Sequence, residues 1–325
     1  MNYTRQLFTS LSQTPLPPNN VSRASTTITP LTRRLFALPP IPASPSPSHN
    51  SLSTFLVYAS RTSLPESTTT YQGTLYEYIV QTYLRNSGFS LYRVGGRSDL
   101  GVDLSGTWHV GANPVTDPPV RVVVQCKSLK GKLGPSVVRE LEGVAGRFVR
   151  ARSSSVTGEG SGGGYAGVLV SPREATKGVR EALGRSGMPL VWMMVGWDGV
   201  LRQVLWNSSV ESLGGGLGGL GVETVYRPGI DPGNESEFAS GSDKVEQRQE
   251  VRLTWEGKEV ETMDETEDGM KRAEVEWFAK WEERGLRDMS AEQILDAVER
   301  EIPGTKPIMI SEEERDEVVK ALLSA

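Results

Sequence analysis

Three consecutive valines directly precede a glutamine, a cysteine and a lysine in the stretch 122–127. A short run of β-branched residues of this kind predicts a buried β-strand. Side chains alternate between the two faces of a strand, so Gln125 and Lys127 share one face while Cys126 lies on the other. Burying an amide and an ammonium group is costly without polar partners. The stretch therefore predicts a buried strand whose end opens into a cleft, with Cys126 as a small core residue.

The segments around this strand alternate between strand and helix patterns. Apolar residues at helical spacing predict helices over 74–89, 135–151 and 174–187. Short apolar runs predict further strands over 90–94, 101–110, 165–171 and 189–195. The order αβββαβαβ predicts an α/β fold with a mixed central sheet flanked by helices.

The N-terminal part of the chain has the composition of a targeting sequence. Residues 1–65 contain no Asp or Glu but five arginines and many Ser and Thr residues. This composition is typical of a mitochondrial transit peptide, which implies a mitochondrial protein with the matrix as its compartment. The alternative is a disordered tail without a targeting role. With a transit peptide, residues 1–65 are expected to comprise that peptide and a disordered linker, and the Pro- and Ser-rich stretch 39–51 is then a flexible segment that is removed or unstructured.

Charge divides the remainder of the chain into a basic and an acidic part. Residues 85–186 hold fifteen Lys and Arg against eight Asp and Glu, and residues 222–325 hold fourteen against twenty-eight. The first part therefore carries +7 and the second −14, which suggests a polyanion-binding core with an acidic extension. No apolar run approaches the length of a bilayer span, so membrane insertion is not expected.

Residues 206–325 are expected to form a Gly-rich linker followed by an acidic, partly helical region. The sequence GLGGLG at 216–221 matches a dinucleotide-binding fingerprint, but it neither follows a clear strand nor opens a helix, so a linker is the better interpretation. Helices are predicted over 290–302 and 311–324. Each begins with a capping-box spacing, Ser290 with Gln293 and Ser311 with Glu314.

Two kinds of chemistry are nearly excluded by residue counts. The chain has one cysteine, so it forms no internal disulfide and no multi-cysteine zinc site. Its two histidines, His49 and His109, are far apart and lack the spacing of metal ligands. Any catalysis is therefore expected to rely on carboxylates, amides and lysines.

An acid on the strand before the valine run supplies such chemistry. Asp103 lies about twenty residues before the Gln125-x-Lys127 pair. The Asp103 carboxylate and the backbone carbonyl of Cys126 are oxygen donors of the kind that Mg²⁺ prefers. Lys127 could then orient or deprotonate a metal-bound water. Two plainer interpretations stay open: Lys127 as a solvated residue at a strand end, and Gln125 as a structural hydrogen-bonding group.

The motifs GGRSDLGVDL, VVVQCK and VRELEGV resemble the PD-(D/E)xK, restriction-endonuclease-like superfamily, in the branch related to the Mrr restriction enzymes. The resemblance covers residues 71–205. Together with the acid-free N-terminus, it makes the chain most similar to the fungal mitochondrial "required for respiratory growth" group. It implies a nuclease-like domain over 71–205 with a restriction-endonuclease-like sheet.

The resemblance also implies roles for individual residues. Asp103 would be the metal-binding acid, Gln125 would occupy the place of the second acid, and Lys127 would be the catalytic lysine. Glu77 would be the helix glutamate that completes the site, although Thr74 and Glu77 also have capping-box spacing. A neutral amide is a weaker ligand than a carboxylate, so one Mg²⁺ or Mn²⁺ ion is expected rather than two.

Basic residues near these motifs in the sequence are candidate nucleic-acid contacts. They are Arg93, Arg97, Lys130, Lys132, Arg139 and Arg147. The alternative is a solvated charged face. The expected function is metal-dependent phosphodiester hydrolysis of nucleic acid, with DNA as the substrate, in mitochondria. The alternative is a catalytically silent, nuclease-derived module that binds nucleic acid or a partner and is needed for mitochondrial maintenance and respiratory growth. The sequence does not indicate an oligomeric state.

Overall fold

A central sheet of six strands organises the molecule. The computed structural model describes residues 38–96, 101–115, 117–129, 131–154, 164–213, 217–228 and 247–282, together with positions 28, 32, 33, 36, 290, 293, 296, 297 and 300. The strands are β1 (Phe89–Arg93), β2 (Leu104–Trp108), β3 (Val120–Cys126), β4 (Tyr165–Ser171), β5 (Leu190–Val195) and β6 (Leu201–Trp206), and they lie in this order across the sheet.

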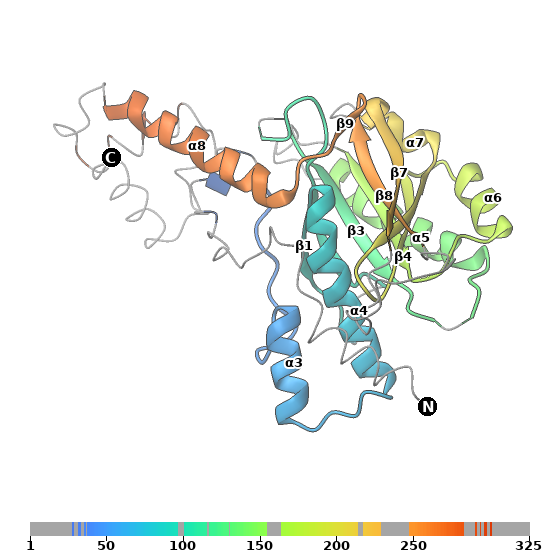
Figure 1. Ribbon diagram of the computed structural model, residues 1–325. Helices are drawn as coiled ribbons and strands as arrows, with labels where there is room; N and C mark the ends of the chain where they lie inside the picture. Colours follow the sequence, from blue (N-terminus) through green and yellow to red (C-terminus); the bar gives the residue numbers. More distant parts are fainter. Residues whose placement is uncertain are drawn as a thin grey trace, which may run out of the picture.

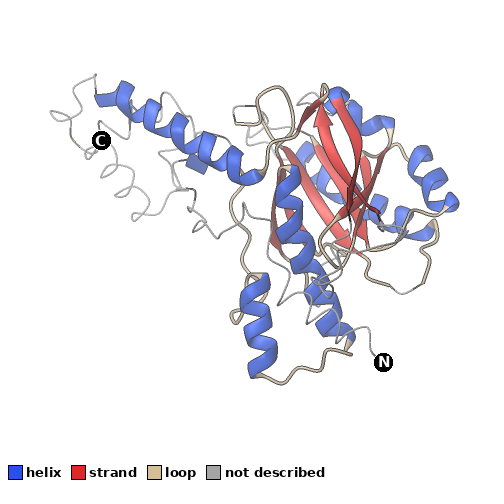
Figure 2. Cartoon of the chain, viewed as in Figure 1, coloured by secondary structure: helices blue, strands red, loops and turns tan. Residues whose placement is uncertain are grey.

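The sheet is mixed. Strands β3, β4 and β5 run parallel, whereas β1 with β2, β2 with β3, and β5 with β6 pair antiparallel. Parallel neighbours need a crossover, and helices α5 (Ser136–Ser154) and α6 (Lys177–Arg185) supply the two connections. The predicted mixed sheet flanked by helices is confirmed (Figures 1 and 2). The restriction-endonuclease-like arrangement implied by the resemblance stays a prediction.

Helices and a second sheet cover the two faces of the central sheet (Figure 1). One face packs against α4 (Thr69–Tyr83) and the short 3₁₀ helix η1 (Leu84–Ser87), and the other packs against α5 and α6. Val122 and Val124 belong to the α4 side, whereas Val123 belongs to the α5 side. The predicted alternation of the valine run is therefore confirmed.

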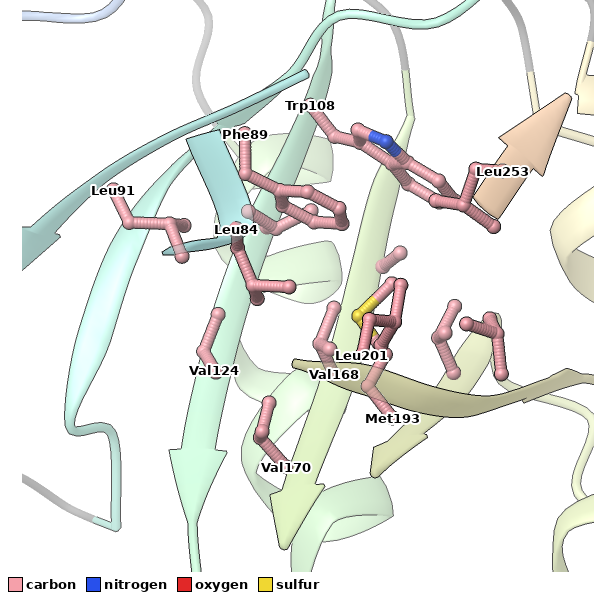
Figure 3. Packing of buried hydrophobic residues seen from close by; sticks show 14 of the residues in the cluster. Leu84, Phe89, Leu91, Trp108, Val124, Val168, Val170, Met193, Leu201 and Leu253 are labelled. Carbon is pink, nitrogen blue, oxygen red and sulfur yellow. The ribbon is translucent and has the colours of Figure 1, made fainter. Parts of the chain in front are cut away.

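A second, three-stranded sheet closes the α4 side of the core. It consists of β7 (Leu220–Pro228), β8 (Gln247–Trp255) and β9 (Lys258–Glu259), paired antiparallel. Phe89 and Trp108 stack with ring centroids 4.7 Å apart, and Leu253 of β8 lies beside them in the same cluster (Figure 3). Residues from the C-terminal third of the chain thus complete the core on this side of the central sheet.

This packing corrects the expectation of a linker after residue 205. Strand β6 pairs with β5 as the last strand of the central sheet. Residues 217–221 of the fingerprint-like segment also belong to the fold, because Leu217 and Leu220 are buried where the second sheet begins. Glycine-rich composition suggested a linker, but two apolar side chains within it pack into the core.

The N-terminal region departs from expectation as well. Within residues 1–65, expected to be a transit peptide and disordered linker, helix α3 (Leu52–Arg61) forms, and the Ser51 side chain accepts a hydrogen bond from the Thr54 amide in a capping box. Phe55 is buried against Tyr71 and Tyr78 of α4. Local capping and an aromatic cluster therefore order a stretch whose composition resembles that of a flexible tail.

Helix α8 (Met263–Glu282) follows the second sheet and extends away from it (Figure 1). Its first turns are tied to the fold, since Arg85 Nη2 donates to Glu267 Oε2 at 2.8 Å. Farther along, the predicted capping box is confirmed by hydrogen bonds from the Ser290 amide to Gln293 and from the Gln293 amide to Ser290. The predicted helix 311–324 lies outside the described residues. No described helix combines the length and apolarity needed to span a membrane.

Candidate active site

Asp103 extends the pairing between β2 and β3 by one residue. Its amide donates to the Val124 carbonyl at 2.9 Å, and its Oδ2 accepts the Cys126 amide at 2.6 Å. The carboxylate is therefore fixed by the backbone of β3 at the strand end where Gln125 and Lys127 stand. Gly101, two residues earlier, has φ +84°, and a side chain there would lie 3.2 Å from Gln125 Nε2. The glycine therefore permits both the turn and the close approach to Gln125.

Gln125 is buried, and only one end of its side-chain amide makes a hydrogen bond. It is 3% exposed, and its Nε2 donates to Glu140 Oε1 at 2.9 Å. Its Oε1 has no hydrogen-bond partner among the described residues. An unpaired buried amide oxygen costs free energy, so such groups commonly mark a site completed by water, an ion or a ligand.

Glu140 of α5 joins this group, although no sequence pattern singled it out. Lys127 Nζ donates to Glu140 Oε1 at 3.1 Å, on the same oxygen that Gln125 contacts. Partial burial acts to raise the pKa of Glu140, but the hydrogen bonds from Lys127 and Gln125 outweigh it and hold that pKa below its ordinary value. Glu140 therefore stays ionised and ties β3 to α5. The only sequence signal was an acid on the predicted helix within the VRELEGV motif.

Glu77 reaches the region from the opposite layer, on α4. Its Oε2 accepts Arg93 Nε at 2.5 Å, and the Arg93 guanidinium lies 5.8 Å from the centre of the Tyr78 ring. The capping-box alternative for Glu77 is wrong, because Thr74 lies inside α4 and the N-cap is Thr68. Glu77 is instead held by a largely buried ion pair with a strand residue.

Cys126 packs on the α4 side of β3, where its surroundings favour the neutral thiol. Burial raises the pKa of its thiol well above the ordinary value, and the carboxylates of Asp103 and Glu77 raise it further. The same effect shows that both carboxylates act electrostatically on one position of β3. The interpretation of Cys126 as a core residue agrees with its packing against the α4-side cluster.

The oxygen donors in this region suit one hard cation. No group of three or more His, Cys, Asp or Glu side chains arranged to hold a metal occurs within the described ranges. The predicted donor set does not depend on such a group, because it consists of Asp103, the Gln125 amide oxygen and the Cys126 carbonyl. Oxygen donors of these three types are those that Mg²⁺ and Mn²⁺ favour. The unpartnered Oε1 of Gln125 is compatible with that set, and the metal stays a prediction.

The predicted basic contacts that the structure describes separate into two groups. Lys132, Arg139 and Arg147 are exposed on or before α5, in the layer that holds Glu140. The Arg93 guanidinium forms an ion pair with Glu77 and lies over the Tyr78 ring, so we assign it a structural role rather than a phosphate contact. The remaining candidates, Arg97 and Lys130, lie outside the described residues. Three accessible basic side chains therefore lie on or directly before α5, the helix that carries Glu140.

Comparisons with known proteins place the chain in a mitochondrial context. Residues 68–117 and 112–226 match the model of the family described as "Required for respiratory growth protein 7". The chain is also 35% identical over 185 residues to a protein of Schizosaccharomyces pombe described as uncharacterized and mitochondrial, covering 56% of this chain and 68% of that protein. No solved structure matches. The mitochondrial location predicted from the N-terminal composition is confirmed, whereas membership of the PD-(D/E)xK superfamily stays a prediction.

Proposed function

The chain belongs to the Required for respiratory growth protein 7 family and is mitochondrial, and we propose that it hydrolyses phosphodiester bonds of DNA with one divalent metal ion. The observation that carries the proposal is the buried, unpartnered Oε1 of Gln125 on the strand next to the fixed Asp103 carboxylate. A purely structural glutamine at 3% exposure would be expected to satisfy both ends of its amide.

Each residue of the group has a role that follows from its contacts. A bound divalent ion would supply charge neutralisation at the phosphate and an acidified water. Asp103 and Gln125 would hold that ion through oxygen atoms, and the Cys126 amide would keep the Asp103 carboxylate oriented. Lys127 would stabilise negative charge on the phosphate or orient the attacking water. Glu140 positions both Gln125 and Lys127.

The surroundings favour an anionic polymer as the substrate. Lys132, Arg139 and Arg147 are exposed close in sequence to the motif and carry positive charge. Phosphate contacts of this kind position a nucleic acid without reading its sequence. The alternative is a silent module that binds nucleic acid or a partner, and the engagement of Lys127 by Glu140 is the observation that favours it.

A cleavage assay separates these functions. The purified full chain is incubated with labelled single- and double-stranded DNA and RNA, with Mg²⁺, with Mn²⁺ and with a chelator. Metal-dependent cleavage of DNA that Lys127→Ala abolishes supports the proposal. Binding without cleavage under either metal supports the silent module. Cleavage of RNA alone would show that RNA, not DNA, is the substrate. Cleavage by Lys127→Ala at the wild-type rate would show that the assignment of Lys127 to the active site is wrong.

A further inference from the structure

Part of the acid-free N-terminal region contacts three separate elements of the fold. We call residues 32–61 the N-terminal strap; the structure describes it at positions 32, 33 and 36 and over 38–61. At its beginning, Thr32 is fully buried and its Oγ1 donates to Glu274 Oε2 on α8 at 2.6 Å. Glu274 is itself buried. A buried carboxylate is costly without polar partners, so Thr32 contributes to the docking of α8.

The middle of the strap covers the edge of the central sheet. Backbone hydrogen bonds from Phe36 to Thr32 and from Leu38 to Arg33 form a turn. The prolines that follow share one cavity of about 90 Å³ with side chains of β1 and β2 and with the buried His109. The residues on the strap side are Leu38, Pro39, Pro40 and Pro42, and those on the sheet side include Tyr92 and Thr107.

The end of the strap packs against α4. The Tyr78 hydroxyl donates to the His49 carbonyl at 3.1 Å and lies 2.8 Å from His49 Nδ1. Phe55 of α3 is 1% exposed, with its ring centroid 5.5 Å from that of Tyr71 and 5.7 Å from that of Tyr78. Removing this part of the strap would uncover two aromatic rings that the rest of α4 does not cover.

We infer that the mature mitochondrial protein retains the N-terminal strap, and that a targeting segment can be removed only N-terminal to Thr32. Removal is the hydrolysis of one peptide bond by a processing protease: water adds across the bond, leaving a carboxylate on the released peptide and an amine on the mature chain. The residues before Thr32 retain Arg5 and Arg23 and contain no acid. They therefore keep the composition of a transit peptide without the strap.

The first test locates the mature N-terminus. The full chain with a C-terminal tag is expressed in a cell, recovered from mitochondria, and its terminal amine is labelled before digestion and mass spectrometry. An N-terminus at or before Thr32 is expected. An N-terminus after Thr32 overturns the inference, because the Thr32–Glu274 contact is then absent from the functional protein.

A second test measures whether the strap supports the fold. Phe55→Ala in the full chain is expected to lower the melting temperature by several degrees, because it removes a buried ring and leaves a cavity beside Tyr71 and Tyr78. Val57→Ala is the matched control on the same helix, since Val57 is 68% exposed, and it is expected to leave melting unchanged. If both variants melt like the wild type, or if limited proteolysis removes the strap without lowering the melting temperature, the strap is dispensable and the inference fails.

Discussion

The ammonium nitrogen of Lys127 lies 3.1 Å from Oε1 of Glu140, joining the end of β3 to helix α5. Lys127 thus has a carboxylate partner, and Oε1 of Glu140 accepts hydrogen bonds from both Lys127 and Gln125.

Lys127→Ala and Asp103→Asn are each expected to reduce metal-dependent cleavage by about 10²–10⁴-fold, the contribution typical of a positioned acid–base group. Neither residue contributes to the two apolar clusters, so far-ultraviolet circular dichroism should stay unchanged. Initial rates of cleavage of a labelled duplex measure the effect. Lys258→Ala is the control, because Lys258 is exposed on β9 and is not among the predicted contacts, and a loss as large as that of Lys127→Ala would contradict the assignment.

Exchanging the amide and the carboxylate between β3 and α5 should reveal their coupling. Gln125→Glu alone places two carboxylates where Nε2 and Oε1 are now 2.9 Å apart, and it is expected to lower stability through like-charge repulsion. Adding Glu140→Gln restores a donor facing an acceptor. The double variant should therefore recover stability with a coupling free energy of about 0.5–3 kcal/mol.

Chemical denaturation of the wild type, both single variants and the double variant measures this coupling. The double variant also offers a second readout, since a carboxylate on β3 should bind Mn²⁺ more tightly than an amide does. Additive losses of stability would show that the two side chains do not interact in solution.

His109 is expected to make stability depend on pH between about 6.5 and 4. Burial lowers the pKa of His109 from 6.5 to about 4, and its Nδ1 and Nε2 lie near the Pro114 carbonyl and the Thr107 hydroxyl. Within this window the unfolded state binds the proton and the folded state does not, so the folded state loses stability as the pH falls. The maximum effect is about 3 kcal/mol.

His109→Gln keeps a donor and an acceptor but does not titrate. Its free energy of unfolding, measured by denaturant at several pH values, should fall less steeply below pH 6.5 than that of the wild type. Other titrating groups contribute to both proteins and cancel in the difference. If the free energies of unfolding of the wild type and the variant fall in parallel with pH, burial of His109 does not make stability depend on pH, and the prediction is wrong.

Binding of DNA is expected to weaken steeply with salt. Replacing Lys132, Arg139 and Arg147 together with Gln should lower affinity and reduce the slope of log affinity against log salt by about one for each phosphate that is no longer neutralised. Fluorescence anisotropy with a labelled duplex measures both quantities. Lys258→Gln, on the exposed strand β9, is the control, and an unchanged slope in the triple variant would place the DNA elsewhere.

Most of the central sheet could be predicted because its strands are apolar and its later strands alternate along the chain with segments of helical periodicity. The pair Gln125-x-Lys127 pointed to a polar strand end, and the structure gives that pair a partner in Glu140. Glu140 itself could not be chosen from the sequence, because an acid on a helix is usually solvated and only the crossover from β3 to β4 places it over Gln125. The position of Glu140 in the site therefore depends on a contact between distant segments, which the local sequence pattern does not reveal.

The second sheet shows a different limit. Val251, Leu253 and Trp255 alternate with polar residues in β8, which is a strand signal. Its partner β7 gives none, because most of its described side chains are exposed. In the strap, Phe55 and His49 pack against the Tyr78 ring of α4 as well as against each other, a long-range contact that local pattern does not reveal. Composition alone therefore assigned both segments to linkers.

The side chains of the candidate site come from different segments: Asp103 directly before β2, Gln125 and Lys127 at the end of β3, and Glu140 on α5. Glu77 lies on α4, on the other side of the sheet. These four segments do not meet until the layers have closed. A chain threaded through a membrane as an extended polymer carries the same segments tens of ångströms apart. The arrangement of these side chains is therefore a product of folding: the chain acquires it only once these segments have packed together.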